Sequence, residues 1–171
     1  MINRPENVDT AIYYMRYIEL VTGEDLLPEL EKNLQDTLSL VATIRNQDLN
    51  FAYAEGKWHI GVLLQHICDA ERVYAYRALR FLRADTNNLP GFDEDAFASN
   101  SIGYTSVEDF IEEFTTIRKA SISLFKNSDL KHIDFVGSAN NLEMTPRILG
   151  WLMLGHNLHH VKVLQERYLI N

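Results

Sequence analysis

The sequence predicts an all-α protein, a four-helix bundle preceded by a short N-terminal helix or arm. Four long segments carry apolar residues at intervals of three and four, a spacing that places them on one face of a helix. No segment shows the alternation of a half-buried strand, and the sequence contains no internal repeat. With 171 residues, the chain suits a single domain over residues 1–171 that can bury a full core.

The first two predicted elements are the N-terminal arm and the first helix of the bundle. The arm has three tyrosines within residues 13–17 and is interrupted by Thr22-Gly23. From Asp25 to Ile44 the apolar spacing predicts an amphipathic helix, which tolerates Pro28 in its first turn.

The remaining three helices follow, with two irregular segments between them. The second helix is expected from about Trp58 to Arg83, and residues 85–104 then form a long loop, which in a compact domain usually carries function. The third helix begins around Thr105-Ser106-Val107-Glu108, whose spacing matches a capping box. After a loop at residues 127–143, Thr145 can cap the fourth helix and Pro146 can take its first position.

Composition and charge exclude several classes of function. The net charge of −8 at pH 7 is unfavourable for a nucleic-acid groove or for an anionic membrane surface. No segment approaches a membrane span, and the N-terminus has no apolar signal core. Cys68 is the single cysteine, so no internal disulfide can form and a reducing compartment fits best. We therefore expect a cytoplasmic protein that binds neither nucleic acid nor membrane and acts on a small molecule.

Three histidines lie within five residues of the fourth helix, on an otherwise apolar run. His156 and His160 are one helical turn apart, so their rings project from the same face. Two imidazoles at this spacing can hold one metal ion without distorting the backbone. His159 is a rival for either position, because it lies three residues from His156.

The second helix offers a third ligand, His66, on its apolar stripe. An imidazole there needs a partner for its ring nitrogens. In a bundle, His66 can point inward at the level of His156 and His160, and three histidines with an open position are typical of a catalytic zinc site. Nickel, iron or manganese would accept the same ligands. The alternative is a bundle without metal, in which the histidines only satisfy one another.

Asp69 is the candidate catalytic residue, as a proton acceptor. It lies one turn after His66, where it can hydrogen-bond the free N–H of a ligand, accept a proton, or be no more than an exposed acid. Glu71 and Cys68 should point away from the face that carries His66, and Cys68 is expected to be a small buried hydrophobic residue.

Other charged residues near these positions have simpler interpretations. Arg77, Arg80 and Arg83 are expected to pair with acidic residues of the segment 93–95, rather than to bind an anionic substrate group. His59 and His132 are expected to be bystanders.

These motifs together resemble the DinB-like metalloenzymes, which are related to bacterial thiol-dependent transferases. The resemblance covers most of the chain. It is carried by Gly56-Lys57-Trp58, by His66-Ile67-Cys68-Asp69-Ala70-Glu71, by Arg77-Ala78-Leu79-Arg80-Phe81-Leu82-Arg83, by Leu89-Pro90-Gly91-Phe92-Asp93-Glu94-Asp95 and by Gly155-His156-Asn157-Leu158-His159-His160. It implies a four-helix bundle of the DinB-like type, a divalent metal ion (zinc or nickel) held by His66, His156 and His160, and a homodimer. In part of the family it also implies a low-molecular-weight thiol cosubstrate.

The sequence thus predicts a metal-dependent enzyme with a three-histidine open site, either a hydrolase or a low-molecular-weight-thiol transferase. The alternative is a non-catalytic, metal-binding stress or sensor protein that dimerises. The fourth helix is apolar nearly all round. Such a helix is either central to its own bundle or covered by a partner. Its back face, made by Trp151, Leu154 and Leu158, is therefore a candidate dimer contact.

Overall fold

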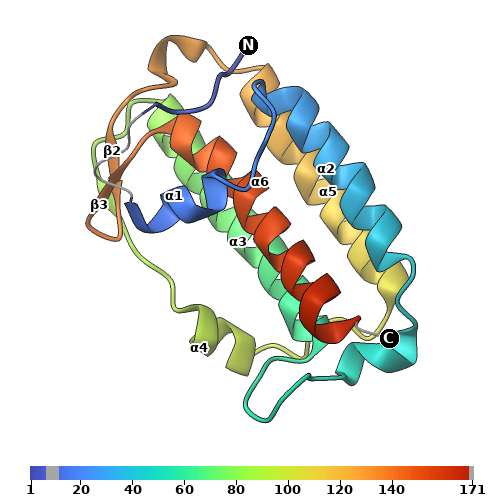
Figure 1. Ribbon diagram of the computed structural model, residues 1–171. Helices are drawn as coiled ribbons and strands as arrows, with labels where there is room; N and C mark the ends of the chain where they lie inside the picture. The colour runs from blue at the N-terminus through green and yellow to red at the C-terminus, as the bar shows by residue number, and fades with distance from the viewer. Residues whose placement is uncertain (7–11, 170–171) are drawn as a thin grey trace.

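The computed structural model describes residues 1–6 and 12–169, and its main body is a bundle of four long helices (Figure 1). The four helices are α2 (Leu26–Val41), α3 (Ile60–Leu82), α5 (Val107–Lys126) and α6 (Pro146–Val163). Helices α2 and α5 lie side by side, as do α3 and α6, and the α3–α6 pair makes the most extensive contact. The predicted four-helix bundle is confirmed.

Shorter elements cover the ends and one side of this bundle. They are α1 (Ile12–Ile18), α4 (Glu94–Ser99), 3₁₀ turns at Asn46–Asn50 and Leu130–His132, and a π-helical end at Leu164–Tyr168. Helix α1, the predicted N-terminal helix, packs on α6. Helix α4 lies in the long segment that follows α3, and it contacts α3. Two short elements from distant parts of the sequence therefore lie against the α3–α6 pair.

A small sheet is present, which no pattern in the sequence predicted. Its strands are β1 (Asn88–Leu89), β2 (Gly137–Ala139) and β3 (Leu142–Met144), in the order β1-β2-β3. Strands β2 and β3 form an antiparallel hairpin, and β1 pairs with β2 in parallel. Asn140 and Asn141 form the turn, both with positive φ (53° and 59°), which is the geometry of a two-residue hairpin turn. Strands of two or three residues are too short to produce an alternating pattern, so the expectation of no strands was wrong.

The starts of α5 and α6 are set by side-chain caps. Ser106 accepts a hydrogen bond from the Asp109 amide (3.2 Å) at the start of α5. The predicted capping box is thus one residue out of register, because Ser106 and not Thr105 is the cap. Thr145 accepts a hydrogen bond from the Ile148 amide (3.2 Å), and Pro146 opens α6, as predicted.

Helix α6 is central to the bundle, which corrects the expected dimer contact. Trp151 and Leu154 are 0% and 1% exposed within the single chain, and Leu158 is half-buried. The indole N–H of Trp151 donates to the Asn3 carbonyl (3.0 Å), so the N-terminal segment covers this face. At Trp151 and Leu154 the apolar back face therefore serves the chain's own core, while dimerisation itself stays a prediction.

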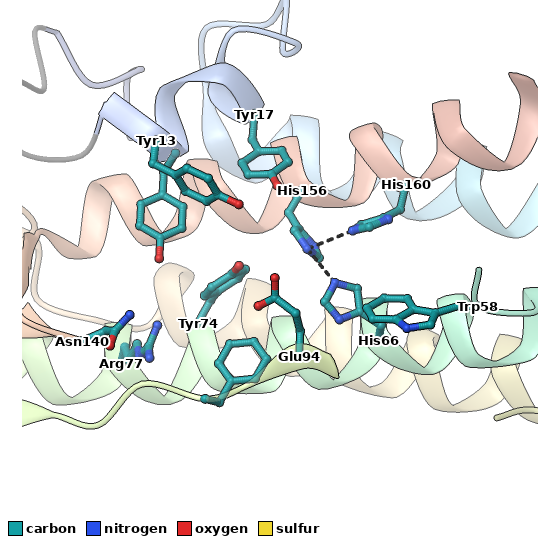
Figure 2. A pocket seen from close by; sticks show the side chains of 12 residues that line it. Tyr13, Tyr17, Trp58, His66, Tyr74, Arg77, Glu94, Asn140, His156 and His160 are labelled. Atoms are coloured by element: carbon teal, nitrogen blue, oxygen red, sulfur yellow. Dashed lines mark hydrogen bonds between the residues drawn. The ribbon is translucent and has the colours of Figure 1, made fainter. Parts of the chain in front are cut away.

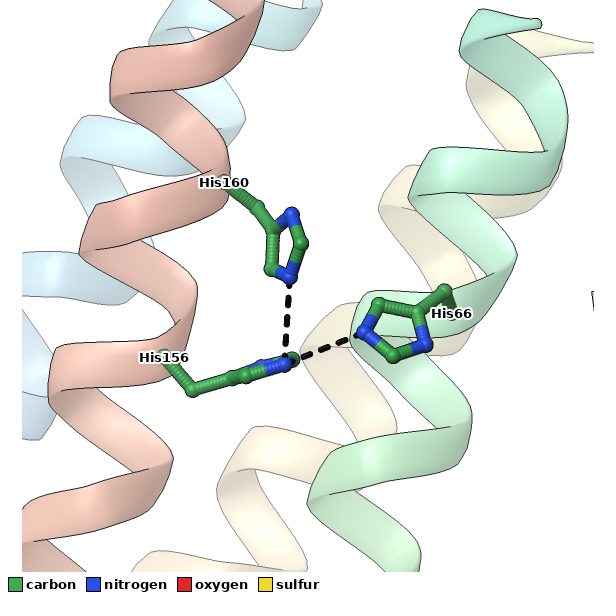
Figure 3. A group of neighbouring side chains, drawn as sticks. All are labelled: His66, His156 and His160. Carbon is green, nitrogen blue, oxygen red and sulfur yellow. Dashed lines mark hydrogen bonds between the residues drawn. The ribbon is translucent and has the colours of Figure 1, made fainter. Parts of the chain in front are cut away.

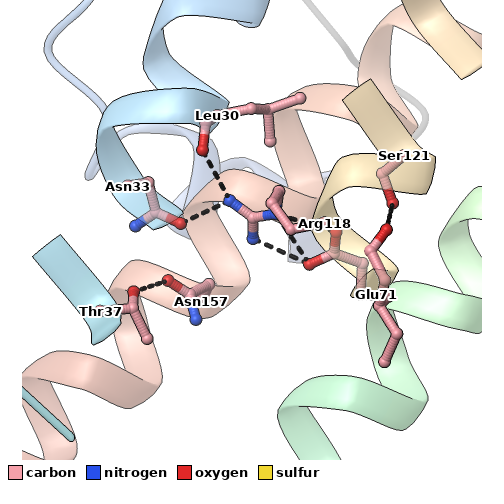
Figure 4. A network of polar contacts seen from close by, with 8 residues as sticks. Leu30, Asn33, Thr37, Glu71, Arg118, Ser121 and Asn157 are labelled. Carbon is pink, nitrogen blue, oxygen red and sulfur yellow. Dashed lines mark hydrogen bonds and ion pairs between the residues drawn. The ribbon is translucent and has the colours of Figure 1, made fainter. Parts of the chain in front are cut away.

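A buried ion pair joins three of the bundle helices (Figure 4). The Arg118 guanidinium of α5 donates to both carboxylate oxygens of Glu71 on α3, with distances of 2.8 Å from Nε to Oε1 and from Nη2 to Oε2. Its Nη1 donates to Asn33 Oδ1 (2.7 Å) and to the Leu30 carbonyl (3.3 Å) of α2. Glu71 thus points away from the histidine face, as expected, and it belongs to the internal packing of the bundle.

None of the helices in the described part of the chain is both long and apolar enough to cross a bilayer.

Candidate metal centre

Two helices bring the predicted histidines together. His66 lies on α3, and His156 and His160 lie one turn apart on the facing side of α6. His59 is the N-cap residue just before α3, and its Nδ1 accepts a hydrogen bond from the Val62 amide (3.3 Å). His59 therefore caps the helix and is a bystander to the cluster, as predicted.

Gly155 allows α1 to approach the histidines closely. A Cβ at this position would lie 2.2 Å from the Tyr17 carbonyl oxygen of α1, which is a severe clash. The glycine next to His156 thus lets the tyrosines of α1 pack over α6. The Tyr17 ring lies 5.6 Å from the His156 ring, centroid to centroid.

The three imidazoles converge on one point between the helices (Figure 3). His156 Nε2 lies 3.1 Å from His66 Nε2 and 3.1 Å from His160 Nε2. One ring nitrogen from each of the three residues lies within 4.8 Å of the others. The predicted meeting of His66 with the pair on α6 is confirmed, while metal ligation by these residues stays a prediction.

The environment keeps all three histidines neutral at neutral pH. Burial lowers the pKa of His66 to about 4. Burial, with the neighbouring histidines as a further cause, lowers the pKa values of His156 and His160 well below their usual 6.5. A neutral imidazole has a free lone pair, which is the form that binds a metal ion.

The residues fit a divalent metal ion better than they fit one another. A hydrogen bond between two imidazoles uses one N–H and one lone pair, so three converging nitrogens cannot all be satisfied by a single shared geometry. Zn–N bonds of about 2.0–2.1 Å in a tetrahedral arrangement separate two ligand nitrogens by about 3.3 Å. Two of the observed separations are 3.1 Å. The site is therefore compatible with a three-histidine metal centre that has an open position.

A cavity of about 160 Å³ opens beside the three imidazoles (Figure 2). Its wall combines aromatic rings with polar groups, which come from α1, α3, α4, α6, the hairpin turn and the residues just before α3 and α4. The lining residues are Tyr13, Tyr14, Tyr17, Trp58, His66, Tyr74, Arg77, Phe92, Glu94, Asn140, His156 and His160. Six of these residues are aromatic and six carry histidine, charged or amide groups, and a concave site with convergent polar groups is a candidate small-molecule site.

Asp69, the predicted proton acceptor, does not line this cavity. It lies with His66 and Glu94 at a much smaller one, of about 10 Å³. Burial raises the pKa of the Asp69 carboxyl, and Arg72, with Nη1 at 3.8 Å, opposes that shift. No hydrogen bond joins Asp69 to a histidine among the described residues, so its catalytic role stays a prediction.

Glu94 is the acidic residue that the sequence reasoning missed. It lies in the first turn of α4, and its carboxylate faces the region between Tyr74 and the histidines (Figure 2). It lines the cavity beside the imidazoles together with all three histidines. Only the return of the segment after α3 toward the bundle places it there. No local pattern in the sequence distinguishes it from Asp93 or Asp95.

The arginines of α3 have different partners from those expected. Arg80 pairs with Asp85 and not with the segment 93–95. Arg77 is 3% exposed, and its Nη2 donates to the Pro90 carbonyl (2.9 Å). No carboxylate of the described residues lies within ion-pair distance of either Arg77 or Arg83. The expected pairing fails because Asp93 is occupied in capping α4, while the carboxylate of Glu94 faces the histidines.

His159 is not part of the cluster. Its ring packs on Tyr17, with a centroid separation of 5.2 Å. It lines a second cavity of about 260 Å³, which also reaches His160 and Trp58. Of the three histidines on α6, His156 and His160 therefore join His66, while the ring of His159 points elsewhere.

A comparison of the sequence with known protein families shows which family the chain belongs to. The family description of the DinB superfamily matches residues 29–164. The chain belongs to the DinB superfamily. The match runs from the first turn of α2 to the end of α6, and it includes all three histidines.

The chain is also similar in sequence to one known protein and in fold to one solved structure. The chain is 26% identical over 153 residues to the "Putative metal-dependent hydrolase OB0413" of Oceanobacillus iheyensis, which covers 85% of this chain and 88% of that protein. The fold of this chain is similar to that of YfiT from Bacillus subtilis, which is described as a probable metal-dependent hydrolase with an unusual four-helix bundle topology. That similarity has a TM-score of 0.66 at 16% identity and covers 95% of this chain and 90% of YfiT.

Proposed function

We propose that this protein is a metal-dependent hydrolase that holds a divalent ion, zinc or nickel, through His66, His156 and His160. The observation that carries the proposal is the convergence of three neutral imidazole nitrogens at the wall of an aromatic cavity. The names of the two relatives support hydrolysis over other metal-dependent reactions.

The chain's own residues would prepare the site for this ion. The three imidazoles are fixed by the facing helices α3 and α6, so little ordering is needed when the ion binds. When bound, a divalent ion supplies Lewis acidity, which polarises a substrate carbonyl and makes water a nucleophile at neutral pH. The rings of Trp58 and Tyr74, which lie 5.0 Å from His66 and 5.7 Å from His156, exclude bulk water from two sides.

Glu94 is the proton acceptor that we propose for the reaction. It is the only carboxylate of the described residues that lines the same cavity as the three histidines. Asp69, the acid predicted from the sequence, is the second candidate, because it lies beside His66. A Glu94→Gln variant should lower kcat by about 10²- to 10⁴-fold and leave metal content unchanged. A comparable loss in Asp69→Asn, with full activity in Glu94→Gln, would assign the role to Asp69 instead.

Metal analysis tests the ligand assignment. Alanine at position 66, 156 or 160 should abolish retention of zinc or nickel by protein purified without a histidine tag. His159→Ala is the matched control, since it removes a histidine from the same helix without touching the cluster. Full metal occupancy in all three ligand variants would refute the site.

Turnover distinguishes the proposed reaction from its two alternatives. The metal-loaded protein should hydrolyse members of a panel of esters and amides. Activity only with a low-molecular-weight thiol and an electrophile would favour the transferase that the family resemblance implies. Metal binding without turnover of either panel would favour the non-catalytic stress or sensor protein.

The homodimer also stays a proposal, now without the predicted contact. Sedimentation equilibrium of the metal-loaded protein should give twice the chain mass. A charge-introducing Trp151→Glu change should unfold the single chain and not merely separate two copies, since Trp151 is fully buried.

A further inference from the structure

We propose that the cavity takes a small organic carboxylate, with Arg77 receiving the carboxylate at the end opposite the histidines. This inference rests on the proposed function, and it names the substrate class that the same site would take. A hydrolase with this arrangement would cleave an ester or amide bond near the histidines in a molecule whose far end is an anion.

The first observation is a buried positive charge without a counter-charge. Arg77 is 3% exposed, and the one acceptor among the described residues is the Pro90 carbonyl, at 2.9 Å from Nη2. By contrast, the equally buried Arg118 is paired with Glu71. Burying a guanidinium without an anionic partner is costly, and an anion in the cavity would relieve that cost.

The second observation is the direction of polarity along the cavity. Figure 2 shows Arg77 and Asn140 together at one end and the three histidines at the other. Tyr74 and Glu94 lie between the two ends. The acidic group is thus on the histidine side, and the end next to Arg77 presents donors.

Two phenols close to Arg77 are further donors. Burial raises the pKa values of Tyr14 and Tyr74, so both remain protonated and able to donate. Burial lowers the pKa of Arg77, and the two phenols partly offset that shift. A carboxylate is the anion that suits one guanidinium with neutral donors. Phosphate groups carry more charge and are usually bound by several cations.

Helix geometry aligns the two ends. His66 and Arg77 are eleven residues apart on α3, which at 3.6 residues per turn puts them on one face, about 16 Å apart along the axis. The Arg77 side chain leans toward the helix N-terminus, and so toward His66, as side chains on helices do. The ligand's anion should therefore be separated from the reacting bond by less than that distance.

Asn140 gives an independent way to change the donor end. It is exposed, it sits in the turn between β2 and β3 with φ of 53°, and aspartate tolerates this backbone region as well as asparagine does. Asn140→Asp therefore places a carboxylate beside Arg77 without removing the bond from Arg77 to Pro90. If Arg77 only ties down the segment at Pro90, the wild type should show no preference for an anion, and this change should have no such preference to remove.

Calorimetric titration with benzoate and benzamide tests the proposal. The two probes have nearly the same shape and differ in charge. The full-length protein, both metal-loaded and chelator-treated, should bind benzoate at least tenfold more tightly than benzamide. Arg77→Met and Asn140→Asp should each lower the affinity for benzoate at least tenfold and leave the affinity for benzamide unchanged. Arg83→Met, an exposed arginine at the end of the same helix, is the matched control and should bind benzoate like the wild type.

Equal benzoate binding by the wild type and both variants would overturn the proposal, as would no preference for benzoate over benzamide. Should circular dichroism show that Arg77→Met is unfolded, Asn140→Asp decides the question alone. Benzoate binding to chelator-treated protein is independent of metal. Arg77-dependent binding in a protein that retains no metal would therefore sustain this inference while refuting the proposed function.

Discussion

Two polar clusters lie inside this bundle, and α3 contributes to both, yet they are built in opposite ways. In the first, Arg118 and Glu71 have opposite charges, and each group of the pair finds a partner within the chain. In the second, His66, His156 and His160 are like groups that face one another. The first cluster is complete as it stands. The second becomes complete only with an added cation, so the comparison separates a structural network from a binding site.

Breaking the ion pair should have the largest effect on stability. Arg118→Ala leaves the Glu71 carboxylate buried without a cation, which should lower the free energy of unfolding by about 3–5 kcal/mol. Urea denaturation followed by circular dichroism measures this loss. The double replacement Arg118→Met with Glu71→Leu should recover most of it, because no buried charge remains. If Arg118→Ala lowered the free energy of unfolding by less than about 1 kcal/mol, the ion pair would not be an important source of stability.

Adding metal should have the next largest effect, and only through the histidine cluster. Zinc at a thousand times its dissociation constant should raise the free energy of unfolding by about 4 kcal/mol. The gain should vanish in His156→Ala and persist in the Arg118→Met/Glu71→Leu protein. Thermal denaturation with and without zinc is the measurement. An equal gain in His156→Ala would place the ion elsewhere.

Acid should destabilise the chelator-treated protein through the same cluster. The folded-state pKa of His66 is about 4, below the value near 6.5 of an unfolded chain. The unfolded chain therefore takes up the proton first, and stability is lost as the pH falls from 6.5 to below 4. The loss should reach about 3 kcal/mol for His66 alone, with His156 and His160 adding to it in the same direction. The midpoints of urea denaturation at pH 7 and pH 4.5 test this. The decrease in stability between the two pH values should be smaller in His66→Gln than in the wild type.

The smallest effect is expected at the hydrogen bond that lies between the clusters. Thr37 of α2 donates to Asn157 Oδ1 (2.9 Å), and Asn157 follows His156 on α6. Thr37→Val leaves a buried acceptor without its donor, at a cost of about 1–2 kcal/mol. Zinc affinity should change less than tenfold, because the ring of His156 is held by α3 and α1 as well. A total loss of zinc binding would show that the two clusters are one coupled unit.

The bundle itself was accessible from the sequence, because each long helix has an apolar face. The apolar run from Leu30 to Val41 and the stripe around His66 follow the helical period, and the structure has helices there. The short elements were not accessible. Strands β2 and β3 have three residues each, and α4 has six, so none is long enough to produce a periodic signal.

The candidate site divides in the same way. His156 and His160 share a helix, so their common direction follows from spacing alone. That His66 meets them depends on how α3 packs on α6, for which the apolar stripe was a sound guide. Glu94, Arg77 and Asn140 reach the cavity from α4, α3 and a hairpin turn. Their meeting depends on where two irregular segments return to the bundle, and local sequence does not encode that.

The sequence by itself determined the helices, the three histidines and the acidic character of the protein. These follow from residue type and from the 3.6-residue period, which act locally. Only the tertiary structure decided that the back of α6 is core, that Asp69 lies outside the cavity beside the three histidines, and that Arg77 lines that cavity. The reason is physical: burial and charge pairing depend on which distant segments pack together, and a single helix carries no record of its neighbours.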